Sequence, residues 1–121
     1  MLRAIKFVSV PVVDQDRSLA FFTEKLGFRV VTDQPFDDRQ RWIELALPGQ
    51  QTGLVLFTMD GHEDRIGGVS NVVFLSDDVG ATYPELSEQG VEFEGEPVEA
   101  DWGTSVVLKD PDGNRFAISS K

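Results

Sequence analysis

The sequence predicts an α+β fold in which a single domain, residues 1–121, is built from two βαβββ modules. The first observation is an internal repeat, because both halves show a strand, an acidic turn, a helix ending at a glycine, and further strands. The second is a constant offset: Phe7 and Asn71 lie 64 positions apart, as do Asp14 and Asp78. The third is that short segments with strand-like alternation are separated by glycine and proline turns. Two copies of one supersecondary unit account for all three.

The first module is predicted over about residues 1–60. Residues 5–10 alternate as a strand does, and Asp14 follows where the N-cap of a helix is expected. Apolar residues recur at helical spacing from Leu19 to Leu26, and Gly27 ends the run as a left-handed C-terminal residue would. Three further strands are predicted over residues 28–32, 41–47 and 54–58.

The second module is predicted over about residues 69–121, after a polar, glycine-rich linker at about 60–68. A strand over 69–75 leads into a helical stretch over 79–89, which Gly90 ends. Proline inside a helix costs about 3 kcal/mol, so the helix either tolerates Pro84 or begins near it. The remaining strands are predicted over residues 91–98, 104–109 and 115–119.

Composition narrows the classes of partner. The chain is 40% hydrophobic, and it has neither a signal-peptide pattern nor an apolar run close to the roughly 20 residues that span a membrane. We therefore expect a cytoplasmic protein with no membrane partner. The absence of cysteine excludes disulfides and thiolate chemistry. A net charge of -10 disfavours nucleic acid and favours a cationic ligand, although it also serves solubility.

Local motifs make this order of elements more specific. Residues 12–14 (VVD) lead into 18–22 (SLAFF) and 26–28 (LGF), and late in the chain Trp102 and Gly103 precede DPDGN at 110–114. Together these motifs resemble the vicinal oxygen chelate superfamily, which includes glyoxalases, bleomycin-resistance proteins and extradiol dioxygenases. The resemblance covers essentially the whole chain. It implies that two curled mixed sheets form a cup around a ligand, and that the chain forms a homodimer.

The resemblance also locates the positions that hold a metal ion in some members of the superfamily. Two histidines, one on the first strand of each module, correspond to Phe7 and Asn71, and two glutamates on later strands correspond to Glu44 and Ala117. A divalent metal needs several nitrogen or oxygen donors, which one carboxylate and one amide do not supply. His62 lies in the polar linker, where we expect a solvated side chain. The prediction is therefore no metal and no other cofactor.

Strand alternation and the resemblance together predict the lining of the cup. Ile43, Leu45 and Leu47 are assigned to the helix-covered face, so Trp42, Glu44 and Ala46 point the other way, and Phe116 and Ile118 are placed in the core in the same manner. The predicted ligand contacts are Phe7, Ser9, Phe22, Trp42, Glu44, Asn71, Trp102, Arg115 and Ala117.

Structural alternatives stay open at several of these positions. Phe7 and Trp42 would fill the cup if it closes into ordinary core, and Trp102 would pack on its own hairpin. Glu44 would pair with Arg41 or Arg115, because a buried carboxylate needs a cation or hydrogen-bond donors.

The leading functional hypothesis is a metal-independent protein that binds or sequesters a small aromatic or cationic ligand. The alternative is a glyoxalase-like lyase, isomerase or dioxygenase that uses Glu44 as a general base or metal ligand, with Asn71 as a hydrogen-bond donor. No recognisable motif supplies a partner acid or nucleophile for the enzyme hypothesis, so the sequence leaves open whether any reaction is catalysed.

Overall fold

The computed structural model describes residues 1–120, which group into two compact units, Met1–Ile66 and the residues from Gly67 onward. The elements of the first unit are β1 (Phe7–Val10), α1 (Gln15–Ala20), η1 (Phe21–Lys25), β2 (Arg29–Pro35), β3 (Arg41–Ala46), β4 (Gly53–Leu56) and η2 (Glu63–Arg65). Those of the second are β5 (Val69–Leu75), α2 (Val79–Glu88), β6 (Glu92–Phe93), β7 (Val98–Ala100), β8 (Gly103–Lys109) and β9 (Arg115–Ser119).

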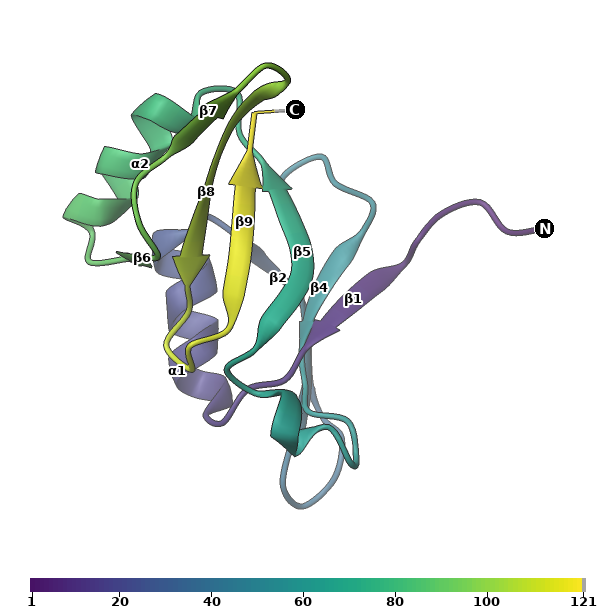
Figure 1. Cartoon of the computed structure of the whole chain (residues 1–121). Coiled ribbons are helices and arrows are strands. Elements are labelled where there is room, and N and C mark those ends of the chain that lie inside the picture. Colours follow the sequence, from purple (N-terminus) through teal and green to yellow (C-terminus); the bar gives the residue numbers. More distant parts are fainter. Residues whose placement is uncertain (121) are drawn as a thin grey trace. The chain divides into compact units, whose positions relative to one another are not determined.

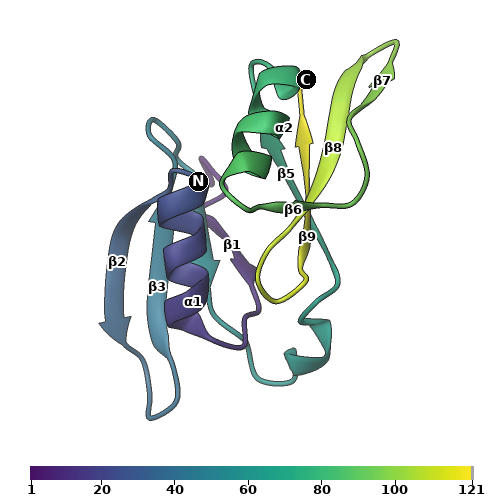
Figure 2. The same cartoon turned by 90° about the vertical axis from the view of Figure 1, so that its left-hand side faces the viewer.

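The first unit is a mixed sheet with one face covered by helix (Figure 1). Its strand order is β1-β4-β3-β2, with β1 parallel to β4 and the other pairs antiparallel. Figure 2 shows α1 lying along one face of these strands. Ile43, Leu45 and Leu56 are fully buried on that face, whereas Trp42 and Glu44 on β3 are half-buried and alternate with them. The opposite face of the sheet therefore presents Trp42 and Glu44.

The first helix begins and ends at the residues that the sequence indicates. The Asp14 side chain accepts a hydrogen bond from the Arg17 backbone N–H at 3.1 Å, as an N-cap does. The helix then widens into the π-helical turn η1, which buries the neighbouring residues Phe21 and Phe22 together. Gly27 follows with φ +81°, a left-handed conformation that costs glycine little.

The second unit repeats the topology of the first. Its order is β5-β9-β8-β6, with β5 parallel to β9, and β7 also pairs with β8. Phe116, Leu108 and Ile118 are buried in its core. The α+β class and the two βαβββ modules predicted from the sequence are confirmed.

One detail of the second unit differs from the prediction. The strand expected over 91–98 is divided into β6 and β7, because Gly95 has φ +88° and Pro97 lacks the N–H that a ladder needs. The helix predicted over 79–89 is confirmed as Val79–Glu88; it tolerates Pro84 in its interior, so the alternative start near Pro84 is wrong. The Asp78 side chain caps the start at Val79 by accepting a hydrogen bond from the Ala81 N–H at 3.1 Å. The ring of Pro84 crowds the carbonyl of the residue four positions earlier, which is Gly80.

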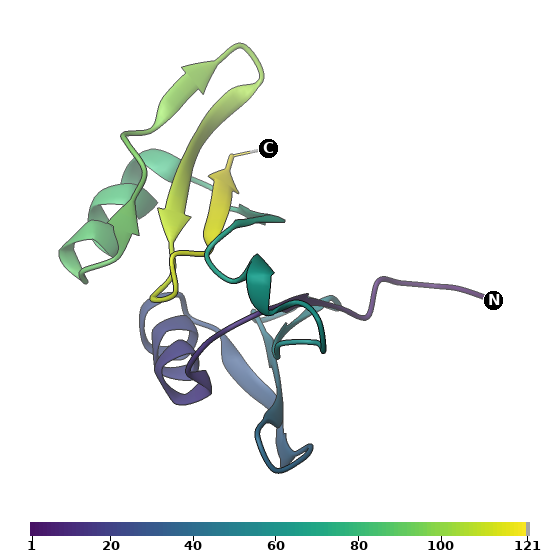
Figure 3. The same ribbon diagram turned by 60° about the horizontal axis from the view of Figure 1, so that its bottom comes forward.

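Two further features complete the fold. The chain before β1 runs on as an extended segment in which every residue from Met1 to Lys6 is exposed (Figure 3). Within residues 1–120, no helix is both long and apolar enough to cross a bilayer.

Candidate functional site

Four aromatic side chains gather on the face of the first sheet that α1 does not cover. Phe7 on β1 and Trp42 on β3 meet edge to face with ring centroids 5.3 Å apart. Phe57, directly after β4, lies 5.1 Å from Trp42. Phe36, in the hairpin between β2 and β3, lies 4.8 Å from Phe57 and 6.1 Å from Trp42. We call these four residues the aromatic cluster.

The members of the aromatic cluster differ in how far solvent reaches them. Phe57 is buried, Phe7 and Trp42 are half-buried, and Phe36 is 60% exposed. The inner rings therefore hold one another in place, while Phe36 and parts of Phe7 and Trp42 offer aromatic surface. Phe7 and Trp42 pack against each other on this face, as the alternative in which they act as core residues predicts. Both stay half-buried, so neither is a fully buried core residue.

Glu44 is the acidic residue next to this aromatic surface. In the sheet it pairs with Val55 on β4 and Thr32 on β2. Its side chain lies across Gly53, where a Cβ atom, if the glycine carried one, would come within 2.9 Å of Oε2. Gly53 thus leaves the room that the carboxylate occupies.

The carboxylate of Glu44 has no hydrogen bond or ion pair with any residue in the described part of the chain. Arg41 donates instead to Asp33 at 3.0 Å and to Asp16 at 2.8 Å, on the helix side of the sheet. Arg115 pairs with Glu94 at 3.4 Å. The alternative in which Arg41 neutralises Glu44 is therefore wrong, because Asp33 and Asp16 engage Arg41. Arg115 belongs to the second unit, and its pairing with Glu44 stays a prediction.

Two other predicted contacts in the first unit have different positions. Ser9 is exposed and pairs with Val55, so it lies in the same row of the sheet as Glu44. Phe22 is fully buried, and its ring contacts Phe21 at 5.2 Å and Phe28 at 5.7 Å. Phe22 is thus a core residue of the helix side, and it has no surface with which to touch a ligand.

In the second unit, Arg115 and Ala117 alternate along β9 with the buried Phe116 and Ile118. Both are half-buried, and in the sheet they pair with Lys109 and Val107 on β8. Ser119, assigned to the same face, is buried as well. The face opposite α2 therefore presents two neighbouring cations, Arg115 and Lys109, beside small and apolar side chains.

Asn71 lies at an irregularity in β5. Between Val69 and Val73 the register with β9 shifts, and Asn71 has φ +63°, the only positive φ at a non-glycine residue in the described part of the chain. Asparagine adopts this left-handed conformation more readily than most residues, although it still costs conformational energy. Strained backbone conformations of this kind cluster at functional sites. Its side chain is exposed.

Trp102 is 52% exposed and lies in the turn that joins β7 to β8. The structure gives it no ring contact with another aromatic residue in the described part of the chain. It is an exposed hairpin side chain, and its predicted role as a ligand contact stays a prediction.

The residues present do not fit the metal that the superfamily resemblance implies. Of the four corresponding positions only Glu44 carries a strong oxygen donor, and Phe7 and Ala117 offer none. Within residues 1–120, no three histidine, aspartate or glutamate side chains come together in a way that could hold an ion.

The late motif at residues 110–114 is a turn built around one buried carboxylate. Asp110 accepts hydrogen bonds from the backbone N–H groups of Asp112 at 2.9 Å and Asn114 at 2.8 Å, and from Asn114 Nδ2 at 2.9 Å. Asn114 in turn accepts from the Gly67 N–H at 2.7 Å. Burial raises the pKa of Asp110, and these hydrogen bonds offset the rise only partly. The motif therefore fixes a turn of the second unit.

Sequence reasoning missed Phe36 and Phe57 as neighbours of Trp42. Phe57 could have been predicted from the sequence, since it lies two residues beyond Val55 and shares its face. Phe36 gave no signal, because it follows Pro35 in a hairpin whose geometry periodicity does not describe. The hairpin is held by Asp37, whose carboxylate accepts from the N–H groups of Arg39 and Gln40, both at 2.9 Å; these hydrogen bonds lower the pKa of Asp37.

Comparisons with known proteins agree with this architecture. The sequence model of the Glyoxalase/Bleomycin resistance protein/Dioxygenase superfamily matches residues 4–118. YetH of Bacillus subtilis (strain 168) is 39% identical over 121 residues, which are 98% of each chain. A superfamily member from Sphaerobacter thermophilus DSM 20745 has a TM-score of 0.88 at 29% identity, covering 98% of this chain and 97% of its own. TnmS3, an antibiotic binding protein from Streptomyces sp. CB03234, has a TM-score of 0.82 at 33% identity, covering 98% and 95%. The chain belongs to the glyoxalase/bleomycin resistance protein/dioxygenase superfamily.

Proposed function

We propose that this chain is a metal-independent small-molecule-binding protein whose ligand is aromatic, cationic or both. The observation that carries the proposal is the aromatic cluster with the unpaired carboxylate of Glu44 on the same face of the first sheet. Apolar walls with few polar groups are typical of small-molecule sites. An aromatic face also attracts a cation, which a neighbouring carboxylate stabilises further.

Three further observations support the proposal. The donor set does not fit a metal, so binding has to rest on the side chains themselves. The net charge of -10 favours the approach of cations. A structural relative, TnmS3, is an antibiotic binding protein, and an antibiotic is a small molecule.

Tryptophan fluorescence tests the proposal directly, because the chain has two tryptophans and only Trp42 belongs to the aromatic cluster. In a Trp102→Phe background, Trp42 reports on its own face. The protein should be titrated with cationic glycopeptide antibiotics, neutral aromatic metabolites and their cationic analogues, with and without EDTA. We expect saturable quenching that EDTA leaves unchanged.

Two variants separate the roles of ring and carboxylate. Glu44→Gln should weaken cationic compounds about three- to thirtyfold, as loss of one cation contact does, and should leave neutral aromatic compounds unaffected. Phe36→Ala should weaken both classes, while Glu24→Gln on η1 serves as a charge-matched control. If no compound changes the fluorescence or the melting temperature, or if EDTA abolishes binding, the proposal fails.

A second candidate function is an enzyme in which Glu44 acts as a general base. The observation in its favour is that this carboxylate makes no ion pair in the described residues and so is free to accept a proton. Once a compound that the protein converts has been found, the Glu44→Gln variant tests this role. Turnover that survives the substitution excludes Glu44 as the general base. The predicted homodimer also stays a prediction, and light scattering at low protein concentration tests it.

A further inference from the structure

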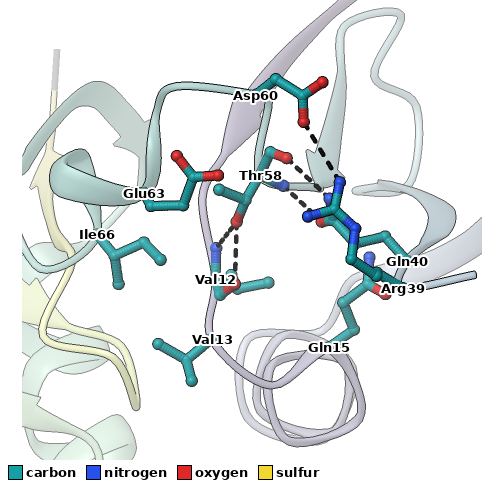
Figure 4. A pocket seen from close by; sticks show the side chains of 9 residues that line it. All are labelled: Val12, Val13, Gln15, Arg39, Gln40, Thr58, Asp60, Glu63 and Ile66. Carbon is teal, nitrogen blue, oxygen red and sulfur yellow. Dashed lines mark hydrogen bonds and ion pairs between the residues drawn. The ribbon is translucent and has the colours of Figure 1, made fainter.

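A cavity lies within the first unit, at the ends of β1 and β4. Its volume is about 310 Å³, near the lower limit of ordinary ligand sites. Figure 4 shows the side chains that line it, which come from the β1–α1 loop, the first residue of α1, the β2–β3 hairpin and the segment after β4. None of them belongs to the aromatic cluster.

The floor of this cavity is a preorganised hydrogen-bond network. Thr58 Oγ1 accepts from the Val12 N–H at 2.9 Å and donates to the Val12 carbonyl at 3.0 Å. The Gln40 side chain binds the Thr58 backbone in the same two-sided way, donating to its carbonyl at 2.8 Å and accepting from its N–H at 2.9 Å. Gln15 likewise bridges Arg41 and Leu56. The side-chain amides of Gln15 and Gln40 and the Thr58 hydroxyl are hydrogen-bonded within the protein. They therefore fix the shape of the cavity, and the residues at its rim are the ones left to contact a ligand.

The rim carries one base and two acids, with a net charge of -1. Arg39 and Asp60 pair at 3.5 Å, but their side chains are 69% and 93% exposed, so the contact is weak. The Glu63 carboxylate lies on the other side of the mouth in Figure 4 and has no hydrogen bond or ion pair with any residue from 1 to 120. Glu63 is therefore the charge left without a counterion.

An apolar wall lies below Glu63. Val13 is 71% exposed and Ile66 is half-buried, and in Figure 4 both side chains lie on the same side of the cavity as Glu63. A ligand held there would place a cationic head at the carboxylate and a short hydrocarbon body against these two residues. An anion is disfavoured, because Asp60 and Glu63 together outweigh Arg39.

From this arrangement we propose a second binding site, for a small organic monocation with an ammonium head and a short apolar body. The site is separate from the aromatic face, so it goes beyond the proposed function. A bound monocation would neutralise the net charge of -1 on the rim.

A pair of probes with one hydrocarbon tail tests the site. Both compounds contain the same 3-methylbutyl chain. In 3-methylbutylammonium this chain carries a positively charged ammonium group, and in 4-methylpentanoate it carries a negatively charged carboxylate. Each is titrated into the full-length, ¹⁵N-labelled protein while the backbone amides are followed by NMR. The ammonium compound should shift the amides of Val13, Glu63 and Ile66 saturably, with a dissociation constant on the order of millimolar. The carboxylate should not.

Two variants complete the test. Glu63→Gln should weaken the ammonium probe at least about threefold, whereas Glu24→Gln, which removes an equally exposed acid from η1, should not. The inference is overturned if the three amides do not respond, if 4-methylpentanoate binds as well, or if Glu63→Gln binds as the unmodified protein does. Shifts confined to Trp42 and its neighbours would also overturn it, and would at the same time support binding at the aromatic face.

Discussion

Replacing Asp110 with alanine should destabilise the protein by about 3 kcal/mol. The substitution removes the acceptor of three hydrogen bonds, and two of the three donors, the backbone N–H and Nδ2 of Asn114, belong to a residue that is 2% exposed. A hydrogen bond to a charged group contributes about 1.5–3 kcal/mol, so loss of the two made by Asn114 costs roughly 3–6 kcal/mol. Relief of the buried carboxylate offsets part of that sum.

Thermal denaturation measures this effect. For a chain of this size a loss of about 3 kcal/mol corresponds to a fall in melting temperature of roughly 10 °C. Asp101→Ala is the matched control, because Asp101 lies exposed in the β7–β8 turn. Equal melting temperatures for the two variants would refute the reasoning, since the Asp110 network would then contribute nothing.

The raised pKa of Asp110 adds a pH dependence whose sign follows from linkage. A carboxyl whose pKa is higher in the folded state binds its proton more tightly there. Its stabilising contribution is complete below the unfolded pKa of about 3.9 and is lost as the pH rises through the folded pKa. Asp110→Asn cannot titrate. Its deficit in unfolding free energy should therefore shrink as the pH rises through this window, which urea titrations at several pH values measure. A deficit that does not vary with pH would contradict the assignment.

Three further substitutions test the geometry of the sheets. Asn71→Val should cost about 1–2 kcal/mol in urea denaturation while Asn71→Gly costs nothing or stabilises, because φ is +63°; equal costs would refute the strain. Arg41→Gln should lose about 1 kcal/mol, and high salt should narrow the difference, because two carboxylates on α1 and β2 share this guanidinium; a difference independent of salt would contradict that account. Gly53→Ala should move the Glu44 carboxylate, since the new Cβ would lie 2.9 Å from Oε2, and the carboxyl ¹³C shift of Glu44 reports whether it does.

Several features of the fold were predictable because they depend on local chemistry. Asp14 and Asp78 cap their helices as aspartates do, and Gly27 and Gly90 take the left-handed conformation that ends each one. The strands over 69–75 and 115–119 have the bounds that alternation predicts. The interruption between β6 and β7 was missed, although Gly95 and Pro97, which cause it, can be read from the sequence.

The candidate site was less predictable. Alternation along β3 correctly assigns Trp42 and Glu44 to one face, because side chains two residues apart point the same way. It does not say that Phe36 lies against Trp42, or that Arg41 turns to Asp33 and Asp16 instead of Glu44. Contacts between strands depend on register and on hairpin shape, which involve residues far apart in the chain.

The sequence alone therefore determined the repeated βαβββ order, the helix ends and the superfamily, since each follows from residue types at fixed spacings. It also showed that three of the four positions corresponding to metal ligands in the superfamily carry other residues. Only the tertiary structure decided that Phe22 is core, that Glu44 lies unpaired across Gly53, and that Glu63 faces a cavity beside Val13 and Ile66. The physical reason is that burial and pairing are properties of neighbours in space, and folding selects those neighbours from distant parts of the chain.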